Sequence, residues 1–436
     1  MQSINVGILG LGTVGGGTAE VLRRNADVIT RRCARQVQVT MASVRDASKS
    51  RSCDCDGVTL TEDPYSIVNS DEIDIVVELI GGETLAKELV LMAIANGKHV
   101  VTANKALIAV HGNEIFAAAD AKGVSVSYEA AVAGGISIIK NLREGFAGNQ
   151  IQSIAGIING TGNFILTEMR DKGRTFEDVL AEAQELGYAE ADPTFDVEGI
   201  DAAHKLAILA AISFGTPLQF DDVYTEGISK LDLVDVDYAQ ELGYRIKHLG
   251  IAKKTDSGLE LRVHPTLIPK KRLLANVNGV MNAILVKGDA VGNTLHYGAG
   301  AGAEPTASAV VADIIDVART CNASSEFKVP ALGFQPESIK SIATKAPSEF
   351  ECAYYLRFIV SDVAGVMSKL SAEFAEQDIS IEGITQKEPE KGQNTVSVIF
   401  ITQKTVEGAL DRAVSKVESL DLVHGSAVKL RVEHLD

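Results

Sequence analysis

An aspartate and a lysine stand four residues apart just after a loop rich in acidic side chains. If this segment is helical, Asp201 and Lys205 share one face. A carboxylate and an ammonium group held together beside Glu190, Asp192 and Asp196 could bind a cationic amino acid and move a proton. The alternative is a surface ion pair worth only about 0.3–0.5 kcal/mol. Because the helix continues as Leu-Ala-Ile-Leu-Ala-Ala-Ile, the lysine at its rim either extends its amine to solvent or is held in place for catalysis.

Two helices are expected to hold this acidic loop in place. The first covers residues 176–186, and Gly187 supplies the turn that ends it. Pro193 cannot continue a helix, so the loop stays open at that point. The second helix is expected to begin near Val197, where Asp196 stands in a position to cap its free N–H groups.

A glycine-rich turn follows the first apolar strand, residues 4–9, and leads into a helix over 18–24. In a strand–turn–helix unit, such glycines permit a tight turn, close approach of a pyrophosphate and tight helix packing. The phosphate would rest against free N–H groups at the helix N-terminus. The alternative is a glycine-rich turn that binds nothing. The expected cofactor-binding residues here are Gly10, Gly12, Thr13, Val14 and Gly15.

The second strand, residues 37–44, should end beside the adenosine ribose of a bound dinucleotide. A site that prefers NAD usually offers an acidic residue there, but Arg45 comes first in this chain and Asp46 second. A guanidinium group can bind a 2′-phosphate with two hydrogen bonds. The sequence therefore predicts a preference for NADP, with NAD still possible. In the alternative interpretation Arg45 is a solvated turn residue.

Strands and helices continue to alternate, which predicts a Rossmann-type, doubly wound parallel sheet in an α/β protein. Lys105 follows the strand that ends Val-Thr-Ala-Asn, so it should stand at the carboxyl edge of the sheet, where ligands bind. By position alone, a role in the active site competes with that of a solvated loop lysine. The expected elements are strands 73–80, 99–103 and 125–128 and helices 85–96 and 113–121.

The second half of the chain predicts an α+β domain with a mixed sheet. Strand-like alternation covers 149–158, 261–268 and 280–286, and a helix is expected over 164–169 after an Asn-Gly-Thr-Gly-Asn turn. A second glycine-rich run, residues 297–302, precedes a helix over 307–320. Gly302 in this run is expected to bring the backbone close to the cofactor. The run lacks the Lys-Ser/Thr of a P-loop, which argues against nucleotide triphosphate hydrolysis.

Composition and charge exclude several kinds of partner. The formal net charge of −17 argues against nucleic acid and anionic membranes. No apolar run reaches about 18 residues, so no membrane span is expected. Five cysteines without framework spacing suggest a reducing compartment, and the N-terminus lacks the features of a signal peptide. The cytoplasm is the expected location.

The acidic loop and its flanking helices also carry a resemblance to a known family. Residues 183–205 resemble the signature of homoserine dehydrogenases, with alanine, Gly-Tyr-Ala, Asp-Pro, Asp-Val, glycine, aspartate and lysine at fixed steps. The sequence Val-Thr-Ala-Asn-Lys-Ala-Leu at 101–107 resembles another motif of the family, whose lysine lines the active site. Positions that match are Ala183, Gly187, Tyr188, Ala189, Asp192, Pro193, Asp196, Val197, Gly199, Asp201 and Lys205.

The resemblance implies an NAD(P)-dependent interconversion of L-homoserine and L-aspartate 4-semialdehyde. It assigns proton transfer to Lys205, supported by Lys105 and Asp201. Glu190 and Asp201 would hold the substrate ammonium and hydroxyl groups, and Asp196 would orient them. Gly187 is expected on the cofactor side, and Lys105 would touch both substrate and cofactor.

The resemblance also implies a structural sodium ion, dimerisation through the substrate domain, and a regulatory tail. The ion would be held by the Glu129 side chain and by the carbonyl groups of Val132, Gly134 and Ile136. Residues 351–436 read as βαββαβ, with a turn at Asp362–Gly365, and resemble an amino-acid-sensing ACT domain. This domain is expected either to mediate feedback inhibition by threonine or to serve only oligomerisation, and a homodimer or homotetramer is expected.

Expected domain boundaries follow from these elements. Residues 1–135 form the nucleotide-binding domain, completed by 306–321, and 136–305 form the substrate and dimerisation domain. Residues 322–350 connect it to the ACT-like domain. Two competing hypotheses remain: a dehydrogenase of another amino-acid semialdehyde, and a catalytically silent sensor of cofactor and amino acid.

Overall fold

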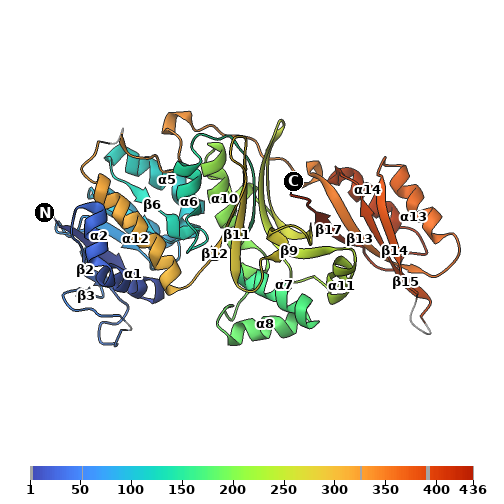
Figure 1. The fold of residues 1–436 in the computed structure, drawn as a ribbon, viewed down its shortest axis with the longest axis horizontal. Coiled ribbons are helices and arrows are strands. Elements are labelled where there is room, and N and C mark those ends of the chain that lie inside the picture. The colour runs from blue at the N-terminus through green and yellow to red at the C-terminus, as the bar shows by residue number, and fades with distance from the viewer. Residues whose placement is uncertain (1–2, 52, 325–326, 389–392, 436) are drawn as a thin grey trace.

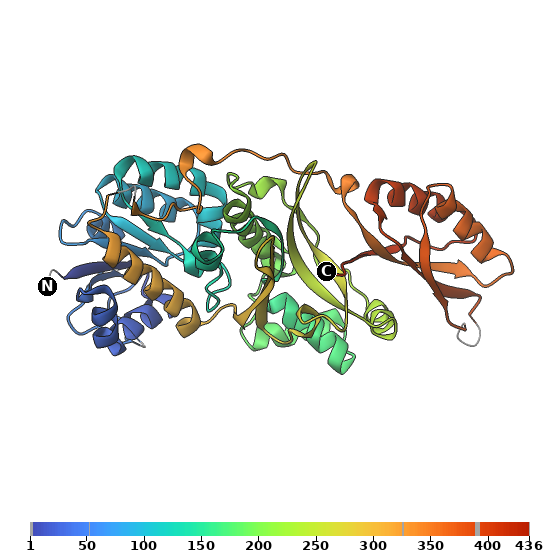
Figure 2. The same ribbon diagram turned by 45° about the horizontal axis from the view of Figure 1, so that its top comes forward.

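In the computed structural model, which describes residues 3–51, 53–324, 327–388 and 393–435, three parts lie in a row (Figure 1). The N-terminal part lies at one end, a large sheet with helices stands in the middle, and the C-terminal part lies at the other end. The second view shows the same order, with one long connection crossing the middle part (Figure 2).

The N-terminal part is a six-stranded parallel sheet with strand order β3-β2-β1-β4-β5-β6. One hydrophobic core lies on each of its faces, as a doubly wound fold requires. Its strands are β1 (Ile4–Leu9), β2 (Val37–Ser43), β3 (Thr59–Thr61), β4 (Ile75–Glu78), β5 (His99–Thr102) and β6 (Val126–Ser127). Its helices are α1 (Thr13–Arg24), α2 (Ala26–Cys33), α3 (Pro64–Val68), α4 (Thr84–Ala95), α5 (Lys105–Lys122) and the returning α12 (Ala303–Thr320).

Helix α12 comes back from the middle part and packs on α1. The approach is close, because a Cβ atom on Gly17 would lie 2.9 Å from the carbonyl oxygen of Ala303. This contact joins α12 to the first helix of the N-terminal part.

Several helices begin earlier than the sequence predicted. Helix α1 starts at Thr13 inside the glycine-rich turn, and α5 starts at Lys105 rather than at residue 113. The expected start of α1 was residue 18, and α12 begins at Ala303 rather than at the expected residue 307. Glycine and β-branched residues near a helix start lower its intrinsic propensity. At α5 the Asn104 cap offsets this loss, whereas α1 and α12 have no side-chain cap, so packing must offset it there.

The middle part is built on a largely antiparallel sheet with strand order β12-β11-β7-β9-β10, and helices α7 and α10 pack against it. Strands β9 and β10 form a long hairpin, of which the sequence predicted only a strand over 261–268. The strands are β7 (Ile151–Ile157), β8 (Tyr224–Thr225), β9 (Tyr244–Thr255), β10 (Gly258–Pro269), β11 (Met281–Gly288) and β12 (Gly292–Ala299). The helices are α6 (Ile138–Lys140), α7 (Gly160–Lys172), α8 (Phe176–Glu185), α9 (Thr194–Val197), α10 (Ile200–Phe214) and α11 (Leu233–Glu241).

The C-terminal part follows the predicted βαββαβ order and extends the middle sheet. Its strand β17 pairs with β13 on one side and, in parallel, with β10 on the other, so one eleven-stranded mixed sheet runs through both parts. The elements are β13 (Glu351–Ser361), α13 (Val366–Ala375), β14 (Ile381–Gln386), β15 (Thr395–Thr402), β16 (Thr405–Val406), α14 (Glu407–Glu418) and β17 (Val428–Val432). The predicted α/β class with a second, mixed sheet is confirmed.

None of the helices in the described ranges is long and apolar enough to cross a membrane.

Candidate active site

The helix that carries the candidate catalytic residues is buried almost throughout its length. Helix α10 follows Gly199, whose φ of +84° lies in the left-handed region that glycine adopts readily. It ends at Gly215, which also has a left-handed conformation, at φ +64°. Its middle belongs to the core that the N-terminal and middle parts share. The sequence of this helix therefore fixes its position by packing on all sides.

Asp201, on the first turn of α10, collects two lysines and an amide. Its Oδ1 atom lies 2.8 Å from the Nζ atom of Lys105, and its Oδ2 atom lies 2.7 Å from that of Lys205. Asn159 donates a further hydrogen bond to Oδ2 at 2.8 Å. Lys205 also donates to the carbonyl oxygen of Ile158 at 2.7 Å. Two amines from distant parts of the chain thus meet on one carboxylate.

Burial and charge shape the titration of this cluster. Burial works to raise the pKa of Asp201, but the positive charges of Lys205 and Lys105 outweigh it and hold that pKa below its usual range. Burial lowers the pKa of Lys205, with Asp201 opposing this change and Lys105 reinforcing it. Burial also raises the pKa of Asp196, against the hydrogen bond from Asn159.

Lys105 reaches the cluster from the nucleotide-binding part. It is the first residue of α5, whose N-cap is Asn104; the Asn104 side chain accepts a hydrogen bond from the Leu107 N–H group. The Lys105 side chain remains 34% exposed, and its amine lies 5.5 Å from the centre of the Phe195 ring. Lys205 is only 12% exposed. The two amines therefore differ in their access to solvent.

The acidic loop differs from the sequence prediction at Asp196. Asp196 does not cap α10: it lies within the short helix α9, and its carboxylate accepts a 2.7 Å hydrogen bond from Asn159. The extra helical turn was hidden from sequence reasoning by Pro193, which stands at the N-cap of α9 and does not end a helix there. The Glu190 residue is exposed, and its carbonyl group accepts a hydrogen bond from Gln184.

The glycine-rich turn after β1 is sterically demanding at two positions and open at a third. A Cβ atom on Gly10 would lie 2.9 Å from the Leu79 carbonyl oxygen, and one on Gly15 would lie 2.1 Å from the Gly10 carbonyl oxygen. A Cβ atom on Gly12 would meet no protein atom within 4 Å. Thr13 and Val14 form the first turn of α1 next to it. Gly12 therefore borders free space at a helix N-terminus, where a phosphate group binds well.

The remaining candidate cofactor-binding residues lie on three different elements. Arg45 is exposed just after β2, whose last residue, Ser43, accepts a hydrogen bond from the Gly10 N–H group. Gly302 is the N-cap of α12, with a φ of +122°. Gly187 ends α8 with a φ of +74° and donates to the Gln184 carbonyl. The conformation of Gly187 is thus explained by the helix end itself.

The candidate sodium residues surround a buried carboxylate. Glu129 is 2% exposed and accepts hydrogen bonds from the N–H groups of Ile139 and Lys140. Burial and the nearby Asp313 raise its pKa to about 7, and no ion pair joins Glu129 to a base within the described ranges. Its surroundings fit a cation, which would favour the charged carboxylate. Val132, Gly134 and Ile136 follow in the same turn, and the Ile136 carbonyl also accepts a hydrogen bond from Ile138.

Two neighbours of the lysine cluster had little or no signal in the sequence. Phe195 was not singled out, because an exposed aromatic residue in a loop has no distinctive spacing. His204 stands next to Lys205 in the sequence. Its ring stacks on Phe220 at 4.1 Å between ring centres, and burial lowers its pKa. Asn159, the first residue of the Asn-Gly-Thr-Gly-Asn turn, bridges Asp196 and Asp201.

A parallel sheet with a glycine-rich turn at its carboxyl edge, facing an amine pair on a buried carboxylate, defines the class of the protein. It is an NAD(P)-dependent oxidoreductase, and comparisons with known proteins identify its family. Residues 10–129 match the model "Homoserine dehydrogenase, NAD binding domain", and residues 137–315 match "Homoserine dehydrogenase". Residues 354–419 match "ACT domain".

Close relatives agree with these matches over the whole chain. The homoserine dehydrogenase of Pseudomonas aeruginosa is 59% identical over 436 residues, covering 100% of both chains. The crystal structure of a homoserine dehydrogenase from Thiobacillus denitrificans superposes with a TM-score of 0.96 at 58% identity, covering 100% of this chain and 99% of that chain. A hyperthermophilic archaeal homoserine dehydrogenase in complex with NADPH covers 72% of this chain, with a TM-score of 0.60 and 26% identity. The chain belongs to the homoserine dehydrogenase family.

Proposed function

We propose that Asp201, Lys205 and Lys105 form the proton-transfer centre of a homoserine dehydrogenase. The single observation that carries this proposal is that amines from two separate parts of the chain meet on one buried carboxylate, at 2.7 and 2.8 Å. A purely structural role would need only one lysine to neutralise Asp201. The second amine leaves a net positive charge, which suits a developing alkoxide oxygen.

Bound at this edge of the sheet, the nicotinamide of the cofactor would exchange a hydride with the carbon that carries the substrate oxygen. Lys205 donates a proton to that oxygen when the aldehyde is reduced and accepts it when homoserine is oxidised. Its lowered pKa supports this role, because a general acid works best when its pKa lies near the working pH. Lys105 polarises the same oxygen and, by its charge, contributes to the low pKa of Lys205.

The acidic side chains bind the rest of the substrate. Asp201 holds the hydroxyl group, and Glu190 pairs with the substrate ammonium group. Asp196 orients both through Asn159, which donates to Asp196 and to Asp201. Because Glu190 is exposed, it contributes once the loop closes over bound substrate.

The cofactor of this site is NADP in preference to NAD. Gly10, Gly12, Thr13, Val14 and Gly15 bring the pyrophosphate to the N-terminus of α1, and Arg45 binds the 2′-phosphate. Lys105 and the backbone at Gly187 and Gly302 approach the nicotinamide end. Arg45→Ala is expected to raise KM for NADPH at least about tenfold, because a bidentate charged contact is lost, and to leave KM for NADH nearly unchanged.

A sodium ion is proposed at Glu129, with carbonyl groups of Val132, Gly134 and Ile136 as the other ligands. The support is the buried Glu129 carboxylate, which accepts two backbone hydrogen bonds. Sodium chloride should raise the melting temperature more than choline chloride at equal ionic strength. In Glu129→Gln the two salts should act alike; equal effects on the wild-type protein would reject the site.

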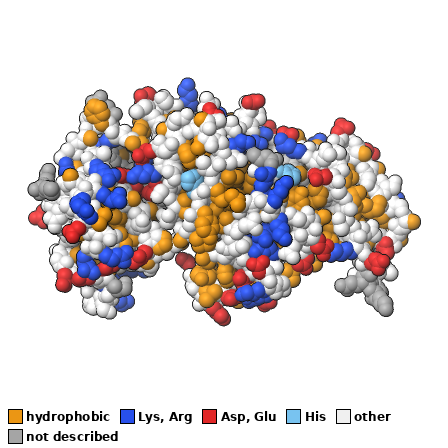
Figure 3. All heavy atoms as spheres, viewed as in Figure 1, with side chains coloured by type: hydrophobic (Ala, Val, Ile, Leu, Met, Phe, Trp, Pro, Cys, Tyr) orange, Lys and Arg blue, Asp and Glu red, His pale blue; other side chains and the backbone are white. Residues whose placement is uncertain are grey.

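The proposed assembly is a homodimer or homotetramer formed through the middle part. Hydrophobic side chains gather on the surface over the middle of the molecule, where Figure 1 has β11 and β12 (Figure 3). Exposed Tyr297, Val291 and Leu273 belong to this part of the chain.

The proposed domain boundaries are 1–135 with 306–321 for the nucleotide domain, 136–305 for the substrate domain, 322–350 for the connection and 351–436 for the ACT-like domain.

The proposed location is the cytoplasm. All five cysteines are free, which agrees with this location.

The deciding experiment is a homoserine oxidation assay with NADP and with NAD, each with and without threonine. Turnover with homoserine, a higher kcat/KM for NADP, and inhibition by threonine are expected. A panel of other amino-acid alcohols and semialdehydes distinguishes a related dehydrogenase. Cofactor binding without turnover of any compound would indicate the catalytically silent sensor instead.

A further inference from the structure

The turn formed by residues 226–229 lies against the residues that begin the catalytic helix. The Ile228 N–H group donates to the Val197 carbonyl at 2.9 Å. Gly227 is packed against Glu198 so closely that a Cβ atom would lie 2.3 Å from the Glu198 carboxylate. Ser229 donates to the same carboxylate at 2.5 Å. Any movement of this turn must therefore move residues 197–199, directly before α10.

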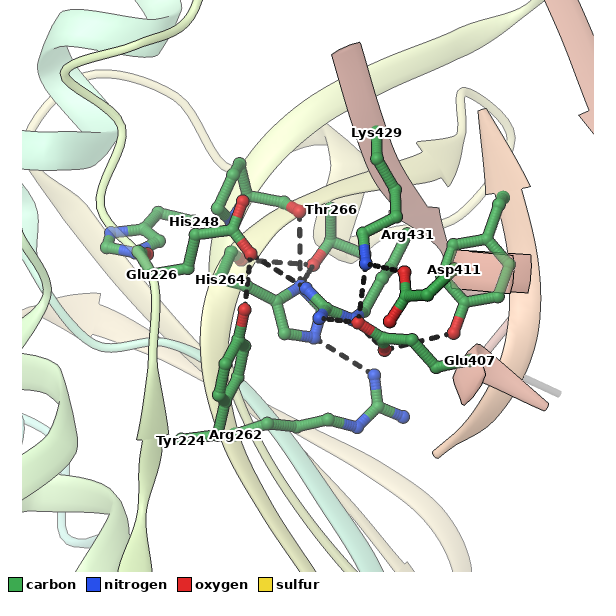
Figure 4. Close-up of polar contacts among 12 residues, drawn as sticks. Tyr224, Glu226, His248, Arg262, His264, Thr266, Glu407, Asp411, Lys429 and Arg431 are labelled. Carbon is green, nitrogen blue, oxygen red and sulfur yellow. Dashed lines mark hydrogen bonds and ion pairs between the residues drawn. The ribbon is translucent and has the colours of Figure 1, made fainter. Parts of the chain in front are cut away.

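The side chain of Glu226 anchors this turn to the C-terminal part of the protein. Arg431 on β17 donates to Glu226 at 2.8 Å, and its other nitrogens donate to Glu407 at 2.9 and 2.5 Å. Tyr224 donates to the same Glu226 oxygen at 3.0 Å, and the guanidinium group lies 4.8 Å from the centre of the Tyr224 ring. The Arg431 side chain is only 2% exposed. Figure 4 labels Arg431 together with Tyr224, Glu226 and Glu407. A buried, doubly paired arginine holds Glu226 in one position.

The main chain of Glu226 holds a histidine that touches the start of α10. The Glu226 carbonyl accepts a hydrogen bond from His248 Nε2 at 2.9 Å, so this nitrogen carries the proton. The Cε1 atom of the ring lies 3.0 Å from the position that a Cβ atom on Gly199 would take. Figure 4 shows His248 beside Glu226. Gly199 directly precedes α10, and Asp201 follows two residues later. The ring therefore occupies the space beside Gly199, directly before the first residue of the helix.

We propose that Arg431, Glu226 and His248 are positioning residues for the catalytic helix, so that the C-terminal domain holds Asp201 and Lys205 in register with Lys105. The inference rests on the proposed roles of Asp201 and the two lysines. Lys105 comes from a different part of the chain, so the Asp201–Lys105 contact depends on where α10 lies. A shift of a few tenths of an ångström at Gly199 lengthens that contact and weakens proton transfer while the nucleotide turn stays intact.

The test compares full-length variants of two ion pairs between the same domains, each with one partner fully or almost fully buried. Glu226→Gln keeps the main-chain carbonyl for His248 but loses the charged contact with Arg431, and Arg431→Gln loses it from the other side. Arg357→Gln is the matched control. Arg357 on β13 binds Asp235 of α11 through two hydrogen bonds of 2.6 and 2.8 Å, and that pair does not include residues 226–229. All three variants lose one domain contact, but only two should affect α10.

The expected result is a fall in kcat for homoserine oxidation of about tenfold in Glu226→Gln and Arg431→Gln, with KM for NADP unchanged. Arg357→Gln should keep a kcat close to that of the wild type. Arg431→Lys should restore part of the loss, and the double variant should be no worse than the poorer single variant. The acidic limb of the pH profile should also move to higher pH in the affected variants. Water reaching Lys205 raises its pKa, and oxidation needs the neutral amine.

Equal kcat values and pH profiles in Glu226→Gln, Arg357→Gln and the wild type would overturn the positioning role. Should Arg431→Gln fail to fold, Glu226→Gln decides alone, because the Glu226 side chain is 34% exposed and its loss leaves Arg431 paired with Glu407. Failure of the proposed catalytic roles looks different: Lys205→Ala would then retain the wild-type rate whatever happens in the Glu226 and Arg431 variants.

Discussion

Asp201 neutralises only one of the two lysines that contact it, and this imbalance gives the cluster its chemical character. Its carboxylate is buried, yet the two amines hold its pKa low, so it stays charged and cannot itself act as the acid. The buried Lys205 is the group whose pKa moves towards neutrality. We therefore propose that the lysine, rather than the carboxylate, transfers the proton.

Lys205→Ala is expected to lower kcat by about 10²–10⁴-fold, because the reacting oxygen loses its proton donor. NADPH binding, measured by fluorescence titration, should remain within error of the wild type, since Lys205 lies outside the glycine-rich turn. Lys98→Ala is the control: this buried lysine binds the carbonyl groups of Ser70 and Ile73, far from the cluster. A Lys98 variant should lose stability but keep its kcat. Near-normal turnover in Lys205→Ala would remove this residue from the mechanism.

At the scale of elements, two glycines of the turn between β1 and α1 are expected to serve different purposes. Gly15 is needed for the fold, and Gly12 for cofactor binding. Gly12→Ala should fold normally, because its Cβ atom meets no protein atom within 4 Å and its φ of −83° suits alanine. The added methyl group would instead meet the pyrophosphate, so KM for NADP should rise at least about tenfold. Gly15→Ala, whose Cβ atom would lie 2.1 Å from the Gly10 carbonyl oxygen, should destabilise the fold by about 1–3 kcal/mol.

Melting curves and cofactor KM values measured on the same preparations distinguish the two effects. A Gly12→Ala protein with unchanged KM would mean that the pyrophosphate does not approach this glycine. A Gly15→Ala protein as stable as the wild type would mean that the turn can open without cost.

Strand β5 begins with a histidine that makes the N-terminal part sensitive to acid. His99 accepts a hydrogen bond from the Ser125 N–H group through Nδ1, and burial is the main cause that lowers its pKa to about 4. The folded state thus binds this proton less tightly than the unfolded chain, where the pKa is about 6.5. The contribution to stability is complete above pH 6.5 and is lost as the pH falls towards 4, by up to about 3 kcal/mol.

In His99→Asn the amide oxygen can accept the same hydrogen bond without titrating. Urea unfolding at pH 7, 6 and 5 should therefore show the variant losing less stability than the wild type over this range. Parallel losses in the two proteins would contradict the assignment, because the acid sensitivity would then come from other groups.

The elements that the sequence predicted well are those with strong periodicity or glycine patterns. The parallel sheet, the helix carrying Asp201 and Lys205, and the C-terminal βαββαβ order all follow from such local signals. Asp196 was misassigned as a cap because the short α9 helix has no periodicity to reveal it. The contacts of Asn159 with two aspartates depend on residues 37 and 42 positions away, which no local pattern encodes.

At the scale of the whole molecule, the C-terminal domain is joined to the substrate part by strand pairing and by buried charge. Strands β10 and β17 pair in parallel through Thr266 with Arg431 and Leu267 with Val432. Sequence reasoning could not find this junction, because it joins segments about 165 positions apart through a very short register. Arg431 and Arg357 lie in the joint with their acidic partners. A buried arginine without its partner is costly, so a rearrangement of the C-terminal domain that broke these pairs would be costly too.

We expect an effector to act through this joint and to bind at the turn between β13 and α13. Gly365 precedes α13 with a φ of +90°, and a Cβ atom there would meet no protein atom within 4 Å. An amino acid could place its carboxylate at the helix N-terminus and its ammonium group near Asp362. Threonine is therefore expected to inhibit homoserine oxidation, and Asp362→Ala to raise the half-inhibiting concentration at least about tenfold, as loss of a charged contact requires.

The measurement is a threonine titration of each full-length protein, scaled to its own rate without threonine. Asp421→Ala, which removes an exposed carboxylate elsewhere in the same domain, should respond like the wild type. A wild-type rate that does not change with threonine would leave the domain with an oligomerisation role alone. Sensitivity lost equally in both variants would mean that net charge, rather than a contact at this turn, governs inhibition. A selective loss in Asp362→Ala would place the effector at the start of α13, on the same domain whose Arg431 contacts Glu226.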